Sequence, residues 1–417
     1  MTRSALLGSA LRMTSGNFLE MFDFFLFGLF APYIAKAFFP MESEFASLLV
    51  TFMTFGAGFL MRPLGAIILG AYIDRVGRRK GLIATFAIMA VGTVVLALCP
   101  TYETIGLFAP VIVLIGRLLQ GFSAGVEVGG VSVYLAELAP PGQRGFYVAW
   151  QPASQQLAIV AAALIGYVVS RSFEQGQIVA WAWRIPFVLG CLIVPFVLML
   201  RRSLPETAEF AARRSIPSFK NIIVQTARDW PNVLSGMTLV MMATVSFYLL
   251  TVYTPTFGKK VLNLSEADSL IATVAVGISN LIWIPLMGAA SDRLGRKKLL
   301  ITFSALTIVT AYPTLYWLSL APSFERLLMA LLWLSFLYGS YNGAMVVSLT
   351  EIVPAAQRTI GFSLAYSLAT ALFGGFTPAI STALIEVMHD RAAPGIWVSF
   401  AAACSLIIVL LSRKRLK

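Results

Sequence analysis

The stretch GAYIDRVGRRK at residues 70–80 is a dense cluster of charge in a chain that is otherwise largely apolar. It recurs as GAASDRLGRKK at residues 288–298, at an offset of 292 − 74 = 218 residues, just over half the chain. Both copies keep the pattern Gly-x-x-x-Asp-Arg-x-Gly-Arg-x-Lys in register. Such self-similarity indicates an internal duplication. We call the two segments the charged knots.

The composition is that of an integral membrane protein. Of the 417 residues, 58% are hydrophobic and only 12% are charged, whereas a soluble domain has about 25% charged residues. Many apolar runs reach the roughly 20 residues that cross a bilayer as a helix, and they lack the alternation of barrel strands. The three cysteines lie far apart, which predicts neither a disulfide framework nor a metal site. No Walker A sequence supports an ATP-driven pump, and we expect no enzymatic activity and no cofactor.

Hydropathy predicts twelve helical spans, so the expected fold class is an all-α polytopic membrane protein with two pseudo-symmetric six-helix bundles. The predicted spans, numbered in chain order, are 16–39, 47–73, 81–99, 107–136, 146–171, 184–202, 233–257, 267–291, 299–320, 327–352, 360–388 and 395–412. The expected domains are an N-terminal half (1–202), a polar and basic cytoplasmic linker (203–232) and a C-terminal half (233–417).

The placement of Lys and Arg predicts the orientation. If the N-terminus is cytoplasmic, that side collects 22 of the 31 basic residues, among them both charged knots and the predicted linker. The other side holds seven, and two arginines fall within spans. The net charge of +12 therefore reflects topology rather than nucleic-acid binding. We expect a multi-pass protein of the bacterial inner membrane, in contact with lipid, with both termini cytoplasmic.

A second repeated segment supports the duplication. Glu137 and Arg144 are seven residues apart, as are Glu351 and Arg358, and the sequence between them is related. Glycines of span 4 likewise recur in span 10, with the small-xxx-small spacing that lets helices pack closely.

The duplicated charged loop between spans of two six-helix halves resembles the major facilitator superfamily. Three stretches resemble its metabolite–proton symporter family: NFLEMFDF at 17–24, RPLG at 62–65 and GRLLQGFS at 116–123. Three further stretches resemble the citrate and tricarballylate branch of this family: SGNFL at 15–19, GVEVGGVSVY at 125–134 and GISNLIW at 277–283. The superfamily's antiport motif is missing from span 5, which favours symport.

Ionisable residues inside a bilayer are costly and mark functional pathways. Spans of the first half contain Glu20, Asp23, Arg62, Arg117 and Glu127, whereas spans 7 to 10 contain no charge away from their ends. We therefore expect proton coupling and charge recognition in the first half.

Asp23 is the first candidate for the proton carrier, followed by Glu20 and Glu127. Asp23 and Glu20 lie within one helical turn, and two close carboxylates in low dielectric do not both ionise easily. The resemblance implies a pair between Asp23 and Arg117 that protonation weakens, which would free Arg117 for a substrate carboxylate. The alternative is a permanent structural salt bridge.

Arg117 presents a planar fork that matches carboxylates. Arg62 precedes Pro63, and a conformational role and substrate contact both stay open for it. Polar side chains on several spans complete the predicted substrate site: Asn17, Gln151, Gln155, Tyr248, Asn280, Tyr341 and Asn342.

The charged knots are interpreted as gates. Their aspartates can face a helix N-terminus across the interface between the halves. Their arginines can pair with Glu137 or Glu351. The predicted gating residues are Asp74, Arg75, Gly77, Arg78, Glu137, Arg144, Asp292, Arg293, Gly295, Arg296, Glu351 and Arg358.

These observations predict a monomeric secondary active transporter that imports citrate or a related tricarboxylate with protons, by rocking of two halves about a midplane site. One alternative is a proton symporter for a C4 or C5 dicarboxylate or a zwitterionic osmolyte. A membrane receptor that signals without transporting is the alternative from another class.

Overall fold

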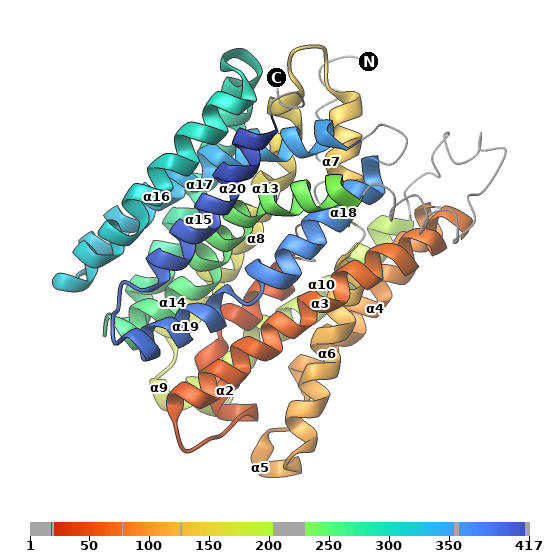
Figure 1. Ribbon diagram of the computed structural model, residues 1–417. Helices are drawn as coiled ribbons and strands as arrows, with labels where there is room; N and C mark the ends of the chain where they lie inside the picture. Colours follow the sequence, from red (N-terminus) through yellow and green to blue (C-terminus); the bar gives the residue numbers. More distant parts are fainter. Residues whose placement is uncertain are drawn as a thin grey trace.

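The protein is described here by a computed structural model that covers residues 18, 21–76, 78–125, 127–202, 230–353 and 358–412. All regular elements in these ranges are helices (Figure 1). The elements of the first half are Met21–Leu29, α2 (Ala31–Phe38), α3 (Glu44–Val76), α4 (Arg78–Leu98), α5 (Tyr102–Ile105), α6 (Phe108–Ala124), α7 (Glu127–Leu138), α8 (Arg144–Ser172), α9 (Gln175–Ala180), η1 (Ala182–Arg184) and α10 (Ile185–Arg202).

The second half continues the pattern with long helices and three π-helical segments, η2, η3 and η5. Its elements are α13 (Trp230–Tyr248), η2 (Leu249–Tyr253), α14 (Thr254–Thr256), η3 (Phe257–Val261), α15 (Glu266–Leu294), α16 (Arg296–Leu320), α17 (Phe324–Ile352), α18 (Arg358–Ala369), η5 (Thr370–Gly374), α19 (Thr377–Met388) and α20 (Pro394–Leu411).

The described ranges contain nine helices that are long and apolar enough to cross a membrane, or ten when one bent pair counts as a single span. Two shorter apolar helices, Ile83–Leu98 and Ala182–Leu192, lie where spans 3 and 6 are predicted. Each predicted span thus has an apolar helix at its place in the described chain. The helix α13 begins at Trp230, slightly before the predicted start of span 7 at residue 233. Residues 203–229, most of the predicted linker, lie outside the described ranges.

Span 1 differs from the prediction of one continuous helix. Met21–Leu29 and α2 meet at an angle of 71°, with Phe30 outside regular helix between them. Pro32 lies in the first turn of α2, where its missing N–H costs nothing. The same residue could not donate to the carbonyl four residues earlier in a continuous helix. The proline therefore breaks the span.

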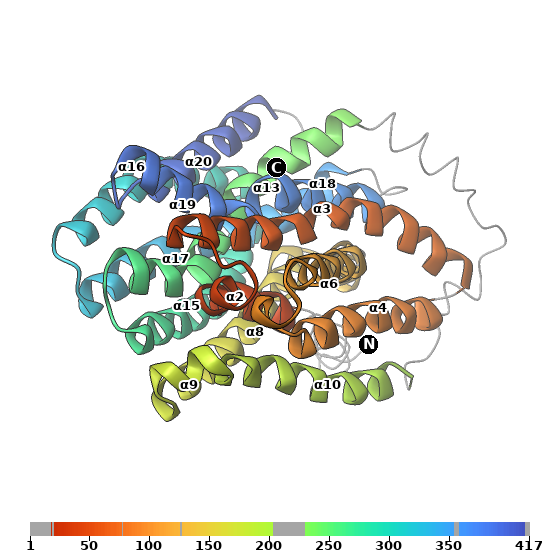
Figure 2. The same ribbon diagram turned by 90° about the horizontal axis from the view of Figure 1, so that it is seen from below.

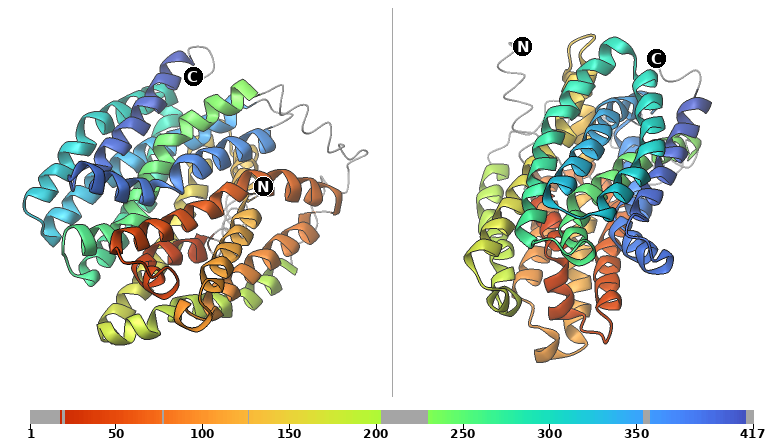
Figure 3. Two further views of the ribbon diagram at one scale, coloured as in Figure 1. Left: turned by 60° about the horizontal axis from the view of Figure 1, so that its bottom comes forward. Right: turned by 90° about the vertical axis from the view of Figure 1, so that its left-hand side faces the viewer.

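The helices form one bundle in which the two halves contact each other along their lengths. α8 packs along α15, and α3 packs beside α18 and α19; the second contact is visible in the left panel of Figure 3. Seen from below in Figure 2, α2 lies at the end of the bundle with α3, α6 and α9 around it. Aromatic side chains of span 1 and α3 contact α13 as well, where Phe25 lies against Phe247 and Phe55 against Tyr248.

Glycines allow the close helix contacts that the repeated spacing predicts. A Cβ atom on Gly288 of α15 would lie 2.5 Å from the carbonyl oxygen of Gly145 in α8. On α17, the equivalents of the span 4 glycines face α15: a Cβ on Gly343 would lie 2.7 Å from the Gly288 nitrogen. Large apolar side chains such as Leu98, Phe108 and Leu192 are exposed on the outside, as a surface that faces lipid requires.

Candidate substrate and coupling site

Two arginines lie in the interior of the bundle, Arg62 on α3 and Arg117 on α6. Their relative exposures are 2% and 0%, so this structure closes them off from solvent. Both guanidinium groups lie over the ring of Phe24 in span 1, with their central carbons 4.9 Å and 4.4 Å from its centroid. Attraction to an aromatic face holds each cation in an apolar place without neutralising its charge.

Further aromatic rings line the same site. The Arg62 guanidinium also lies 4.5 Å from the centroid of Phe59, and that of Arg117 lies 5.0 Å from the centroid of Phe55. The ring of Tyr248 on α13 lies 5.2 Å from Phe59 and 5.9 Å from Phe55. Tyr248, a predicted substrate residue, thus reaches the arginines from the second half, and Tyr366 of α18 is also within electrostatic range of Arg62.

The arginines retain unused hydrogen-bond donors. Nε and Nη2 of Arg62 and Nε and Nη2 of Arg117 have no hydrogen-bond partner in the described chain. Buried polar groups are nearly always hydrogen-bonded, so each exception needs an explanation. Two adjacent cations with free N–H groups form a site that can bind an anion, above all one with more than one carboxylate.

Asp23 is buried near this site, but its expected direct pair with Arg117 is not formed. One carboxylate oxygen, Oδ2, accepts a hydrogen bond from the Thr93 hydroxyl on α4. The other, Oδ1, has no partner in the described chain. Nη1 of Arg117 donates instead to Oε1 of Gln120 at 2.7 Å. The direct pair is wrong for this structure because polar side chains of α4 and α6 occupy the positions between the two charges.

The side chains of the other predicted carboxylates lie outside the described set. Glu20 and the substrate candidate Asn17 lie outside the described residues. Glu127 is the first residue of α7, but its side chain is outside the described set. Among these candidates, Asp23 is the carboxylate that the structure positions.

The glutamines of α8 divide into two kinds. Gln151 is fully buried, and neither its amide nitrogen nor its amide oxygen has a partner in the described chain. Gln155, one turn later, is also buried. Gln156, which the sequence analysis passed over, accepts a hydrogen bond from Asn280 at 3.1 Å and so links α8 to α15.

Three predicted substrate residues of the second half are engaged in helix packing. Asn280 donates to Gln156 and accepts from Ser335 of α17 at 2.7 Å. The Tyr341 hydroxyl donates to the Leu239 carbonyl at 2.8 Å. Asn342 donates to the Tyr338 hydroxyl at 2.9 Å. These hydrogen bonds use groups that a substrate would otherwise take.

The second charged knot contacts the first half directly. Asp292 accepts hydrogen bonds from the backbone nitrogens of Gly145 and Phe146, at 2.9 Å and 3.2 Å, in the first turn of α8. Arg296 binds Asp292 at 3.1 Å and also pairs with Glu351. A carboxylate at a helix N-terminus is stabilised by the free N–H groups and the helix dipole.

The remaining predicted gating residues are only partly described by the structure. Gly295 takes a positive φ of 91° between α15 and α16. Arg293, Glu137 and Arg144 are exposed. Gly77 and the side chains of Asp74, Arg75, Arg78 and Arg358 lie outside the described set.

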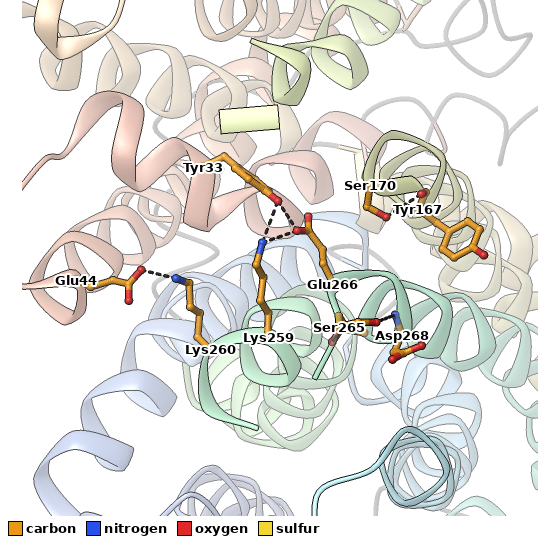
Figure 4. A network of polar contacts seen from close by, with 10 residues as sticks. Tyr33, Glu44, Tyr167, Ser170, Lys259, Lys260, Ser265, Glu266 and Asp268 are labelled. Carbon is orange, nitrogen blue, oxygen red and sulfur yellow. Dashed lines mark hydrogen bonds and ion pairs between the residues drawn. The ribbon is translucent and has the colours of Figure 1, made fainter. Parts of the chain in front are cut away.

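The opposite end of the bundle carries contacts between the halves that the sequence analysis missed (Figure 4). Lys259 of η3 pairs with Glu266 of α15 and donates to the Tyr33 hydroxyl of α2 at 3.0 Å. Tyr33 in turn donates to Glu266. Next to them, Lys260 pairs with Glu44 of α3. Both lysines therefore hold elements of the two halves together.

Sequence reasoning also missed the residues that surround the charges. Gln120 could have been predicted from the sequence, because it lies three residues after Arg117 in the stretch 116–123 and therefore on the same helix face. No sequence pattern singles out Thr93 or the rings of Phe24, Phe55 and Phe59, because their role depends on which helices become neighbours.

A multi-pass helical bundle with buried arginines in its first half, and with contacts between its two halves at both ends, is typical of a membrane transporter of the major facilitator type. The chain belongs to the sugar (and other) transporter family, whose sequence pattern matches residues 10–412. This finding confirms the predicted fold class and superfamily.

Curated relatives are similar along nearly the whole chain. The chain is 61% identical over 403 residues to the citrate-proton symporter of Klebsiella pneumoniae, covering 97% of this chain and 91% of the relative. It is 34% identical over 408 residues to the alpha-ketoglutarate permease of Escherichia coli (strain K12), covering 96% and 92%. Among solved structures, the partially occluded inward-open xylose transporter XylE from E. coli superimposes with a TM-score of 0.78 at 19% identity, over 99% of each chain.

Proposed function

We propose that this transporter imports citrate, or a closely related tricarboxylate, together with protons. The observation that carries the proposal is the pair of buried guanidinium groups of Arg62 and Arg117, both over Phe24 and both with unused N–H donors. The chain's similarity to a citrate-proton symporter over 97% of its length supports the choice of substrate.

The charges of the site suit a polycarboxylate. Two fixed cations face one buried carboxylate, Asp23, so the site has a surplus of positive charge. A tricarboxylate offers one carboxylate to each arginine fork and a third group to a neutral donor. Tyr248, beside the same aromatic rings, and the unpartnered amide of Gln151 are the proposed neutral contacts.

Asp23 is the proposed proton carrier. Its buried position makes the ionised form costly unless a partner compensates, and its Oδ1 atom has none in the described chain. Uptake of a proton there would neutralise the carboxylate, and release on the other side of the membrane would restore it.

Alternating access follows from the division into halves, residues 1–202 and 233–417, joined by a linker within residues 203–232. Asp292, which is bound by Arg296, holds the knot end closed against α8, and the Lys259 and Lys260 contacts hold the opposite end. We assign the knot end to the cytoplasm, in a monomer of the bacterial inner membrane whose two termini are cytoplasmic.

A panel of carboxylates in proteoliposomes tests the function. With an imposed inward proton gradient, labelled citrate should accumulate, and a protonophore should abolish the accumulation. Unlabelled tricarballylate, α-ketoglutarate and glycine betaine compete in parallel reactions. Accumulation of α-ketoglutarate without competition by citrate would replace the tricarboxylate by a dicarboxylate as substrate.

A binding measurement separates recognition from coupling. Citrate at about 100 times its Kd should stabilise the purified protein by about 2.7 kcal/mol, which appears as a higher melting temperature. Arg117→Gln should lose this shift, whereas Arg171→Gln, the same change at an exposed residue of α8, should keep it.

A further inference from the structure

Asp23 and Arg117 are connected through two intermediate side chains. Nη1 of Arg117 donates to Oε1 of Gln120 at 2.7 Å. Nε2 of Gln120 donates to the Thr93 hydroxyl at 3.2 Å, and this hydroxyl donates to Oδ2 of Asp23. Every donor in the series points from the guanidinium towards the carboxylate, so each bond polarises the next.

The packing of α4 against α6 creates this series. A Cβ atom on Gly92 of α4 would lie 2.6 Å from Cγ of Gln120 and 2.7 Å from the Gly116 carbonyl oxygen of α6. The absence of side chains at these two glycines lets the helices approach until Thr93 reaches Gln120. Gln120 follows Arg117 by three residues and therefore lies on the same face of α6.

Thr93 has a choice of acceptors. Its hydroxyl lies within hydrogen-bond distance of Asp23 Oδ2 and also of the Met89 carbonyl oxygen, at 3.2 Å. A hydroxyl carries one hydrogen, so it can donate fully to only one of them. The hydroxyl donates to Asp23 while this carboxylate is ionised, because charge-assisted hydrogen bonds are roughly twice as strong as neutral ones.

We propose that Thr93 and Gln120 are positioning residues that transmit the protonation state of Asp23 to Arg117. The inference rests on the proposed function, because it takes Asp23 as the proton carrier. A proton from the aqueous phase binds Oδ1, the carboxylate oxygen without a partner, and converts the carboxylate into a neutral acid. Thr93 then faces two neutral acceptors and loses its preference for Asp23.

The change reaches Arg117 through Gln120. Once Thr93 turns to Met89, the amide of Gln120 loses its place in a polarised series, and Arg117 is free to move Nη1 from Gln120 to a substrate carboxylate. When the proton leaves, the series re-forms and withdraws that donor. Proton binding and anion binding therefore favour each other, as symport requires.

The surroundings of Asp23 leave this series as its polar link. On α10, a Cβ atom on Gly190 would lie 2.5 Å from Oδ1, so backbone without a side chain covers that oxygen. Cys191 of α10 and Arg117 of α6 lie within electrostatic range of Asp23, and Arg62 lies within range of Arg117. In the described chain, Thr93 makes the hydrogen bond to Asp23.

The test compares Thr93→Val, which removes the hydroxyl at nearly constant shape, with Thr93→Ser, which keeps it. Thr307→Val is the matched control, because Thr307 of α16 is equally buried and donates only to the Phe303 carbonyl of its own helix. The readout is the ratio of citrate KM at alkaline pH to KM at acidic pH, measured by citrate exchange in proteoliposomes without a gradient.

In the parent protein and in Thr307→Val, KM should rise roughly tenfold from acidic to alkaline pH, as expected when a charge-assisted hydrogen bond is made or lost. In Thr93→Val the ratio should fall to within about twofold of unity while exchange continues, and Thr93→Ser should restore it. Gln120→Leu should behave like Thr93→Val, which keeps the test valid if either variant folds poorly.

The outcomes separate the two hypotheses. A parent protein whose citrate exchange does not depend on pH, and which does not accumulate citrate in a proton gradient, contradicts the proposed function. A parent protein that couples normally, with Thr93→Val and Gln120→Leu keeping its full pH dependence, contradicts the inference alone.

Discussion

Arg62 and Asn280 occupy the same place in the two halves, yet their surroundings differ. The offset of 218 residues that carries Asp74 onto Asp292 also carries Arg62 onto Asn280. Asn280 is satisfied by Gln156 and Ser335, whereas Arg62 keeps two nitrogens without partners in the described chain. The duplication supplied a common helix framework, and we propose that the protein binds its substrate where the first half departs from that framework.

The wider contrast between the halves has the same character. The second half buries Tyr341, Asn342 and Asn280 in completed hydrogen bonds. The first half buries the charged Arg117 and Asp23 with atoms left unpaired, whereas the unpaired atoms described in the second half are three hydroxyls and Nε of Arg296. Completed hydrogen bonds specify a packing, whereas open ones in low dielectric favour a ligand.

Replacing Arg117 should have the largest effect on this contrast. Arg117→Gln removes the buried charge that we propose binds a substrate carboxylate. Loss of one partner of such a pair costs about 2–5 kcal/mol, a roughly thirtyfold or larger loss of citrate affinity. Arg117→Lys keeps the charge without the planar fork and should fall between this variant and the parent. Unchanged citrate KM in Arg117→Lys would argue against bidentate recognition.

Asp23→Asn should uncouple transport without abolishing it. The amide cannot carry the proton, so accumulation of citrate against its gradient should disappear, while exchange of internal for external citrate continues. Both are measured with labelled citrate in the same proteoliposomes. Continued accumulation in Asp23→Asn would remove Asp23 from the coupling mechanism.

Substitutions at the two equivalent positions, Arg62 and Asn280, test the comparison itself. Arg62→Asn should raise citrate KM roughly tenfold, because one charge-assisted contact is lost. Asn280→Ala should leave KM within about twofold but lower the free energy of unfolding by about 1–3 kcal/mol, since its partners stay buried and unpaired. If Asn280→Ala changed KM and left the melting temperature unaltered, Asn280 would take part in citrate binding rather than in helix packing.

The charged knots are the feature that both halves retain, so their variants should resemble each other. Asp292→Asn weakens the contact with the N-terminus of α8, and the Asp292 side chain is only 5% exposed; the expected cost is about 1–2 kcal/mol. Citrate uptake should slow by several fold in Asp292→Asn and in Asp74→Asn, with little change in citrate Kd. A defect in one variant alone would mean that the repeat is not symmetric in function.

The smallest effect is expected at the other end of the bundle. The Lys260–Glu44 pair is 25% and 59% exposed, and exposed pairs contribute about 0–1 kcal/mol. Lys260→Gln should therefore change the citrate uptake rate less than Asp292→Asn does. Lys259→Gln, which breaks a more buried link to Glu266 and Tyr33, should lie between the two.

Much of the fold could be predicted from the sequence, and less of the site. The spans follow from apolar length, but the break at Phe30 and the early start of α13 at Trp230 depend on local details that hydropathy averages away. The site residues Arg117, Arg62 and Asp23 stood out because charge in a membrane span is costly. Their partners did not, and the expected direct pair was wrong because Thr93 and Gln120 lie between the two charges.

The sequence by itself determined the class of protein, because helix length, the distribution of Lys and Arg and the repeated knots are properties of the chain read in order. Only the tertiary structure decided which buried groups are satisfied. Thr93 meets Asp23 across 70 residues of chain, and Asn280 meets Gln156 across 124. These hydrogen bonds depend on how closely whole helices approach each other. Which of them form is therefore determined by glycines such as Gly92 and Gly288, and not by the polar residues alone.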